Sequence, residues 1–315
     1  MTLNRRAFFG TSSLAGIPLL GTACADLEKS NHVLATTTLV ADLVTEILPS
    51  TIPVRLLMGP GIDPHTYEPT AGTIAHIRQA KLIVGHGLHL EGRLTNLLET
   101  SKSGAIHRVS LITRPIEISK PERLRKSDHA WDPHIWFDAS LWAETVIPLS
   151  KVLEEVFPEL RAEIAKKANK CFQTLDQLHA EMQAGYSSIP ENKRILITSH
   201  DAFGYLGQAY CLEVHAIQGI STAAEVSESA LRDLAELACQ KQVNVGFLES
   251  TVSPRTLEKL RSLIRARSPR AMPLEFRMGG EIYSDSLGGP NSGAATYASM
   301  MRHNLRVIVG ALKNE

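Results

Sequence analysis

The first part of the chain alternates short apolar runs with helical patterns. Between residues 32 and 110, runs of strand length are followed by stretches in which apolar positions recur every three or four residues. This alternation is typical of βαβ units and predicts a parallel sheet flanked by helices. The expected strands are 33–39, 54–58, 82–84 and 106–109, and the expected helices are 41–48, 73–79 and 90–98. Residues 113–132 are polar, which predicts a surface loop, and residues 139–156 again follow a helical pattern.

The longest helical pattern covers residues 158–187, where apolar side chains such as Ile164, Ala168 and Leu175 recur at three- and four-residue steps. A helix of this length would extend about 45 Å at 1.5 Å per residue. Pro158 suits its first turn, where a backbone N–H has no partner within the helix. We interpret this segment as a rigid spine between two lobes. The alternative is a long helix packed on a single sheet.

The alternation of strands and helices resumes after Pro190. The expected strands are 195–197, 212–217, 243–248 and 272–276, and the expected helices are 203–210, 227–240, 254–266 and 294–312. The second half therefore repeats the architecture of the first half. We expect an α/β protein with an N-terminal lobe at 32–157, a linking helix at 158–187 and a C-terminal lobe at 190–315. Each lobe would hold a small, mostly parallel sheet.

Residues 1–24 have the order of an export signal: a charged start, an apolar stretch at 14–20 and small residues before Cys24. The adjacent Arg5 and Arg6 favour the twin-arginine route over the general route. The residues around Cys24 resemble a lipobox, with a glycine where leucine is usual, which predicts a lipid on Cys24. The alternative is plain cleavage with Cys24 unmodified. Both interpretations place the mature protein outside the cytoplasm, in the periplasm or on the outer face of the membrane.

Composition narrows the range of functions. Lys+Arg and Asp+Glu both number 33, so the formal net charge is zero, and a nucleic-acid partner is not expected. No apolar stretch is long enough for a transmembrane helix. Beyond Cys24 the chain has three cysteines and no Cys-x-x-Cys pair, which argues against a thiolate metal site. Cys171 falls on an apolar helix stripe and is expected in the core, and pairing of Cys211 with Cys239 is left open.

Four loop segments carry candidate metal ligands, and three of them directly follow a predicted strand. In open α/β sheets, ligands bind beyond the carboxyl ends of the strands. Two facing lobes would bring His65, His134, His200 and Asp285 together in the cleft between them. Three imidazoles and one carboxylate suit a divalent cation such as Zn²⁺. The segments are Asp63-Pro64-His65, Asp132-Pro133-His134, Ser199-His200-Asp201 and Ser284-Asp285-Ser286.

Nearby acids are candidates for orienting these imidazoles, because a carboxylate that accepts a ring N–H fixes the tautomer. The candidates are Asp63, Asp132, Asp138 and Asp201. Two further histidines, His86 and His89, are expected to hydrogen-bond locally at a strand-to-helix turn. The chain contains no His-Glu-x-x-His, Gly-x-Ser-x-Gly or Walker motif, so we do not expect an enzyme.

Six segments together resemble the metal-binding solute receptors of zinc and manganese ABC importers. These segments are Gly61-Ile62-Asp63-Pro64-His65-Thr66-Tyr67-Glu68-Pro69, Gly87-Leu88-His89-Leu90-Glu91, Asp132-Pro133-His134-Ile135-Trp136-Phe137-Asp138, Ser199-His200-Asp201-Ala202-Phe203-Gly204-Tyr205, Gly219-Ile220-Ser221-Thr222-Ala223-Ala224-Glu225 and Tyr283-Ser284-Asp285-Ser286-Leu287-Gly288. The resemblance implies two lobes joined by a rigid helix, with a metal ion buried between them.

The resemblance also implies that His65, His134, His200 and Asp285 bind the metal. It places Glu225 and Glu249 in loops that line the lobe interface, where they would support the site without binding the ion. Manganese-selective members of the family usually have a glutamate where this chain has His200, which favours Zn²⁺. Dedicated zinc receptors often carry a histidine-rich loop, and residues 111–129 hold one histidine, His129. Zn²⁺, Mn²⁺ or both are therefore the expected cargo.

The function expected from this resemblance is an extracytoplasmic receptor that delivers Zn²⁺ or Mn²⁺ to an ABC permease driven by a cytoplasmic ATPase. We expect a monomer whose contact with the membrane is through the N-terminal lipid. Two alternatives come from other classes of protein. One is a secreted zinc-dependent hydrolase, which would keep an open position for water on the metal. The other is a surface adhesin, which would expose an apolar surface to its partner.

Overall fold

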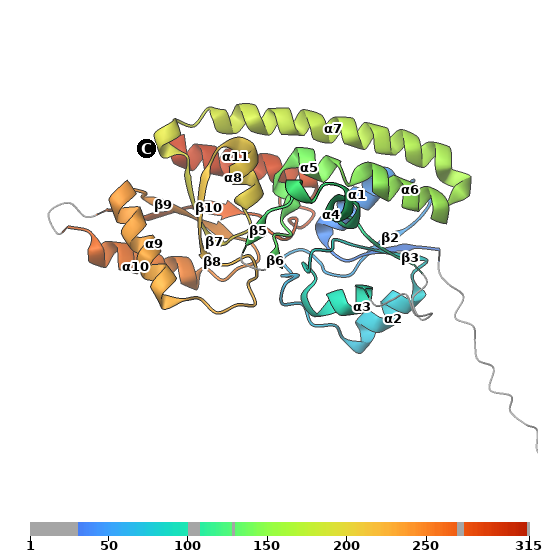
Figure 1. The fold of residues 1–315 in the computed structure, drawn as a ribbon, viewed down its shortest axis with the longest axis horizontal. Helices are drawn as coiled ribbons and strands as arrows, with labels where there is room; N and C mark the ends of the chain where they lie inside the picture. The colour runs from blue at the N-terminus through green and yellow to red at the C-terminus, as the bar shows by residue number, and fades with distance from the viewer. Residues whose placement is uncertain (1–30, 100–107, 128–129, 270–273, 314–315) are drawn as a thin grey trace, which may run out of the picture.

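The computed structural model describes residues 31–99, 108–127, 130–269 and 274–313. Two α/β lobes lie side by side, and helix α7 (Arg161–Ser187) runs along both of them (Figure 1). We call the part of the chain before α7 the first lobe and the part after it the second lobe. This arrangement confirms the predicted α/β fold with a long connecting helix. The export signal predicted at 1–24, which includes Cys24, lies outside the described residues. His129, the one histidine of the segment 111–129, lies outside them as well.

The first lobe contains a sheet of parallel strands in the order β2-β1-β3-β4. Every residue of β1 and β3 is buried, as expected for strands covered on both faces. The elements of this lobe are β1 (Val33–Ala35), α1 (Thr38–Ile47), β2 (Val54–Leu56), α2 (Ala71–Gln79), β3 (Leu82–Gly85), α3 (Thr95–Glu99), β4 (Val109–Leu111), α4 (Arg114–Ser119), β5 (Lys126–Ser127), β6 (Ala130–Trp131), α5 (Ala139–Ala143) and α6 (Val146–Val156).

Local capping explains where β1 ends. The sequence predicts a strand at 33–39, but the hydroxyl of Thr37 accepts a hydrogen bond from the backbone N–H of Val40 at 3.3 Å. A side-chain oxygen in this position caps a helix, so the chain leaves the sheet at Ala35 and α1 begins at Thr38.

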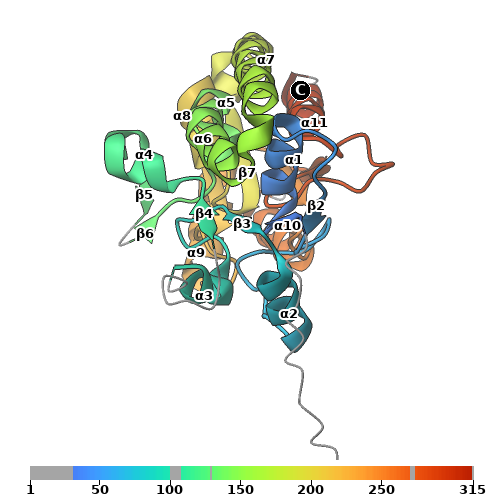
Figure 2. The same ribbon diagram turned by 90° about the vertical axis from the view of Figure 1, so that its right-hand side faces the viewer.

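The prediction of a surface loop at 113–132 is wrong. Pro115 lies in the first turn of α4, and β5 pairs with β6 in an antiparallel hairpin. These elements project from the side of the first lobe (Figure 2). Ile116 and Leu124 anchor them in the core, while most of their other side chains reach solvent. The few apolar residues in this segment do not recur at a helical or strand spacing, so the sequence did not indicate these elements.

Helix α7 has 27 residues and follows a short 3-10 turn at Pro158–Leu160. It packs against α1, α5 and α6 of the first lobe and against two helices of the second lobe. The buried side chains lie on one face, as the three- and four-residue spacing predicts, although Phe172 is exposed. They are Ile164, Ala168, Cys171, Leu175, Leu178, Met182 and Tyr186.

The second lobe contains two pairs of parallel strands, β7–β8 and β9–β10, and β7 lies beside β9. The sequence predicted the last strand at 272–276, but β10 begins at Arg277. Gly279 and Gly280 interrupt the apolar pattern of this strand, so the sequence did not indicate it there. A Cβ atom on Gly279 would lie 2.7 Å from the Phe247 ring, so glycine is required there. The elements are β7 (Ile195–His200), α8 (Gly204–Tyr210), β8 (Glu213–Gln218), α9 (Glu228–Lys241), β9 (Val245–Glu249), α10 (Arg255–Arg267), β10 (Arg277–Ile282) and α11 (Tyr297–Lys313).

One apolar core extends across both lobes. The rings of Phe137 and Phe203, from different lobes, have their centroids 4.4 Å apart. The indole of Trp136 donates to the carbonyl of Ser284 at 3.0 Å, and the hydroxyl of Tyr297 donates to the carbonyl of Trp136 at 2.6 Å. These buried contacts hold the lobes together.

The cysteines have separate environments. Cys171 is buried, as the helix pattern predicts, while Cys211 and Cys239 are free and do not form the pair that the sequence left open. Within the described ranges, no helix combines the length and the apolar character that crossing a membrane requires.

Candidate metal centre

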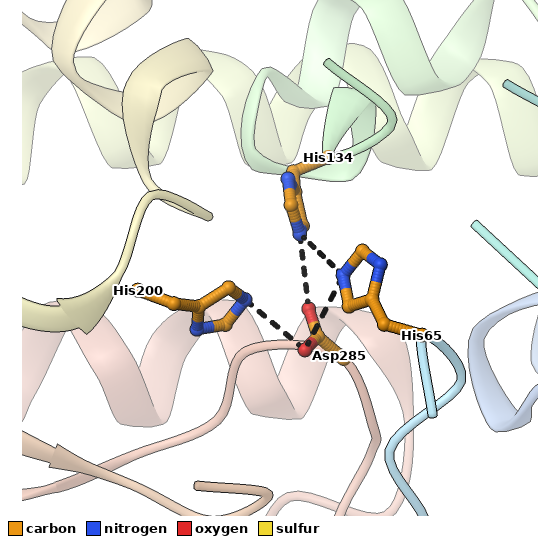
Figure 3. A group of neighbouring side chains, drawn as sticks. All are labelled: His65, His134, His200 and Asp285. Atoms are coloured by element: carbon orange, nitrogen blue, oxygen red, sulfur yellow. Dashed lines mark hydrogen bonds and ion pairs between the residues drawn. The ribbon is translucent and has the colours of Figure 1, made fainter. Parts of the chain in front are cut away.

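Four side chains meet between the lobes, one from each of four chain segments (Figure 3). His65 follows β2, His134 follows β6, His200 ends β7 and Asp285 follows β10. Each offers one ligand atom, and these atoms all lie within 4.8 Å of one another. His65 is 8% exposed, and the other three are at most 1% exposed. The structure thus brings together the four residues that the sequence suggests as ligands.

The separations inside this cluster match the size of a metal ion. The Nε2 atoms of His65 and His134 are 3.3 Å apart. The carboxylate of Asp285 lies 3.3 Å from Nε2 of His134, 3.1 Å from Nε2 of His200 and 3.9 Å from Nε2 of His65. Ligands about 2.0–2.1 Å from a tetrahedral Zn²⁺ are about 3.3–3.4 Å from one another. The donor set therefore suits a small divalent cation.

Asp132 holds the imidazole of His134 from behind. One carboxylate oxygen lies 2.7 Å from Nδ1 of His134 and accepts the backbone N–H of the same residue at 3.0 Å. The other oxygen accepts from the Arg125 guanidinium at 2.7 Å. A carboxylate on Nδ1 fixes the tautomer in which Nε2 has a free lone pair, which is the form that binds a metal.

Glu249 performs the same task for His200. One oxygen of its buried carboxylate lies 2.5 Å from Nδ1 of His200. The other oxygen accepts the backbone N–H groups of Ser199 and His200, at 2.7 and 2.9 Å. Glu249 ends β9, so this contact ties the neighbouring strand to β7. The resemblance placed Glu249 at the lobe interface, and the structure adds the contact with His200.

The electrostatics of the cluster differ from one side chain to the next. Burial lowers the pKa of His65 to about 3. Burial opposes a charge on His134 too, but its hydrogen bonds to the carboxylates of Asp132 and Asp285 raise the pKa of His134 to about 9. The carboxylates around His200 likewise raise its pKa, and the imidazoles hold the pKa of Asp285 well below its usual range despite burial. The site therefore favours positive charge at its centre.

Three other predicted residues lie elsewhere. Asp138 accepts from the backbone of Ser140 at 2.9 Å and caps α5. Asp201 lines a cavity of about 570 Å³ together with Arg125, and its carboxyl has a raised pKa because of burial. Glu225 is exposed on the loop after β8. In the described part of the chain, we find none of these three carboxylates against an imidazole of the cluster.

The sequence did not indicate that Glu91 and His86 support the site. Glu91 is fully buried, and its carboxylate accepts from the backbone N–H groups of His86 and Gly87, at 2.5 and 3.2 Å. His86 was expected to bond locally, but its Nε2 lies 2.6 Å from the carbonyl of Pro133, next to His134. Burial lowers the pKa of His86 to about 3, so the ring is a neutral donor to that carbonyl. The available signal was the acid Glu91, which directly follows the strand and turn at 82–90.

The fold and the site together define a class of protein: two α/β lobes with a shared core, joined by a long helix, that enclose three histidines and an aspartate. The chain belongs to the family described as "Zinc-uptake complex component A periplasmic", whose model matches residues 33–311. Members of this family are the substrate-binding components of metal importers. This membership confirms the resemblance drawn from the sequence motifs.

Two curated relatives show the breadth of this family. The zinc-binding protein TroA of Treponema pallidum is 35% identical over 292 residues, which cover 93% of this chain and 92% of TroA. The manganese-binding lipoprotein MntA of Bacillus subtilis is 31% identical over 309 residues, which cover 97% of each chain. The solved structure of periplasmic TroA superimposes with a TM-score of 0.82 at 34% identity and covers 90% of this chain and 99% of that one.

Proposed function

We propose that this protein captures Zn²⁺ or Mn²⁺ outside the cytoplasm through His65, His134, His200 and Asp285. It then delivers the ion to an ABC permease that a cytoplasmic ATPase drives. The single observation that carries the proposal is the buried cluster of one carboxylate and three Nε2 atoms, whose spacing suits a small cation. The relatives named for zinc and for manganese support these two metals. Three imidazoles favour Zn²⁺, because Mn²⁺ prefers more oxygen ligands.

The four-ligand set supports cargo binding over catalysis. A hydrolytic zinc site has three protein ligands and leaves the fourth position to water. Here four side chains point at one centre, and all of them are buried. The family of receptors to which the chain belongs also favours the receptor over the hydrolase and the adhesin.

The domain limits and the location complete the proposal. The lobes would extend over 32–157 and 190–315, with the linking helix at 158–187. The protein would be a monomer, exported by the twin-arginine route and anchored by a lipid on Cys24. Since the lobes share a core, closure on the metal would be a small tilt with loop motion, unlike a wide hinge.

Elemental analysis of the purified mature chain, followed by competition between Zn²⁺ and Mn²⁺, tests the function. We expect one ion per chain. Alanine in place of each of the four side chains should weaken binding strongly, whereas His76→Ala, a matched change at an exposed histidine of α2, should leave affinity unchanged. Unchanged Zn²⁺ affinity in any one of the four variants would remove that residue from the ligand set. Wild-type protein that takes up neither ion would refute the proposal.

A further inference from the structure

A hydrogen bond crosses from one lobe to the other beside His65. The hydroxyl of Thr222, on the loop after β8, donates to Oδ2 of Asp63 at 2.5 Å. The other oxygen of Asp63 accepts the backbone N–H of His65 at 2.9 Å. One carboxylate therefore connects a residue of the second lobe to the backbone of a ligand of the first lobe.

Among the three histidine ligands, His65 has the fewest supports of its own. His134 and His200 each have a carboxylate against Nδ1, from Asp132 and Glu249. Within the described residues we find no carboxylate against Nδ1 of His65, and this side chain is the most exposed of the four. His65 and His200 approach Asp285 from opposite sides (Figure 3). The position of His65 thus depends more on its backbone turn than the positions of the others do.

The loop that carries Thr222 is folded back on the end of β8. The side-chain amide of Gln218 donates to the carbonyl of Ala224 at 2.7 Å, and Ser221 accepts the N–H of Ala223 at 3.3 Å through its hydroxyl. Thr222 itself is half-buried, while Ala223 and Ala224 are exposed. These bonds fix the backbone that delivers the Thr222 hydroxyl to Asp63.

Other bonds between the lobes are more deeply buried. Trp136 donates to the carbonyl of Ser284, and the hydroxyl of Thr38 lies 3.3 Å from that of Ser286. All four of these residues are at most 5% exposed, in contrast to Thr222 and Asp63, which reach solvent. When the lobes separate slightly, the bond between Thr222 and Asp63 can therefore break while the buried contacts remain.

We infer that Thr222 is a positioning residue for metal retention: from the second lobe it holds Asp63, and through Asp63 it keeps His65 on the ion. This inference rests on the proposed function and adds a role for the loop after β8. Loss of the Thr222 hydroxyl would leave all four ligands present but free the turn that carries one of them. The effect is expected mainly on the rate of metal release, because the encounter of the ion with the other three ligands is unchanged.

The test measures Zn²⁺ release from the mature, zinc-loaded chain after mixing with an excess of a chromogenic chelator. We expect Thr222→Val to release Zn²⁺ about five- to tenfold faster, the effect of one lost hydrogen bond. Thr222→Ser, which keeps the hydroxyl, should restore the wild-type rate. Thr51→Val is the matched control, since it makes the same change at an exposed threonine away from the site, and its release rate should stay within about twofold of wild type.

A double-mutant cycle separates this role from a general weakening of the loop. In the background of Asp63→Ala, which has no side-chain partner for the hydroxyl, Thr222→Val should add little, because both changes remove the same bond. Additive effects would overturn the inference. So would a wild-type release rate for Thr222→Val, or failure of Thr222→Ser to restore retention. Wild-type protein that takes up neither Zn²⁺ nor Mn²⁺ would refute the proposed function itself, which the metal content shows before any rate is measured.

Discussion

The tripeptide Asp-Pro-His occurs twice in the first lobe, and the two copies behave differently. In both, the aspartate accepts the backbone N–H of the histidine, at 2.9 Å for His65 and 3.0 Å for His134. Beyond that shared turn, Asp132 also reaches the ring of its own histidine at 2.7 Å, whereas Asp63 directs its second oxygen to the other lobe. The local sequence therefore sets the turn, and the tertiary neighbours decide what the carboxylate does.

This difference assigns distinct tasks to two ligands that look alike in the sequence. His134 is fully buried, has a fixed tautomer and lies in a network that reaches Arg125. His65 lies closer to solvent and depends on a bond that the other lobe provides. His134 is thus held in place within the first lobe, whereas His65 is held in place only when the lobes meet.

The largest expected effect comes from removing the ligands themselves. His134→Ala and His65→Ala should each weaken Zn²⁺ binding by more than the roughly 10- to 100-fold that loss of an orienting group causes. The loss should be greater for His134→Ala, which also leaves the buried carboxylate of Asp132 without its imidazole. Competition titration against a chelator of known affinity measures both. Equal losses would contradict the distinction between His134, which the first lobe holds in place, and His65, which depends on the second lobe.

The next effect compares the two aspartates. Asp132→Asn removes the charge that orients the His134 ring, so Zn²⁺ affinity should fall by roughly 10- to 100-fold. Asp63→Asn retains an oxygen that can accept the His65 N–H, and its effect on affinity should be at most about tenfold. Parallel titrations of the two variants give the comparison. A larger loss for Asp63→Asn would reverse the assignment of tasks.

Arg125 allows the comparison to be extended to stability. Its guanidinium pairs with Asp132, whose side chain is 2% exposed. Arg125→Met would leave that carboxylate buried with fewer partners, so the free energy of unfolding of the metal-free protein should fall by about 1–3 kcal/mol. Arg93→Met is the control, because Arg93 and Glu68 form an exposed ion pair, and its effect should stay within about 0.5 kcal/mol. Urea unfolding measures both, and similar losses would contradict a special role for Arg125.

The same contrast between local sequence and tertiary contacts explains how much of this molecule the sequence could predict. The alternation of elements, the long helix and the four converging side chains depend on local patterns and on motifs, and the sequence indicated them all. The bond from His86 to Pro133 joins residues 47 positions apart and has no local signal. Strand β10 was misplaced because glycines replaced the apolar pattern where the Phe247 ring packs closely. Contacts set by tertiary packing are what the sequence alone did not reveal.

The smallest expected effect comes from replacing the proline of each Asp-Pro-His tripeptide. It should be the same in both copies, because the proline turn is the feature that they share. Pro64 and Pro133 stiffen the two turns, and alanine at either position mainly gives the unfolded chain more freedom. Each variant should lose about 0.4–1 kcal/mol of unfolding free energy. The carbonyl of Pro133, which accepts from His86, is retained in Pro133→Ala, so that bond does not distinguish the two variants. Urea unfolding of the metal-free proteins measures the pair. A clearly larger loss for Pro133→Ala would mean that its turn is stabilised by tertiary contacts and not by the tripeptide itself.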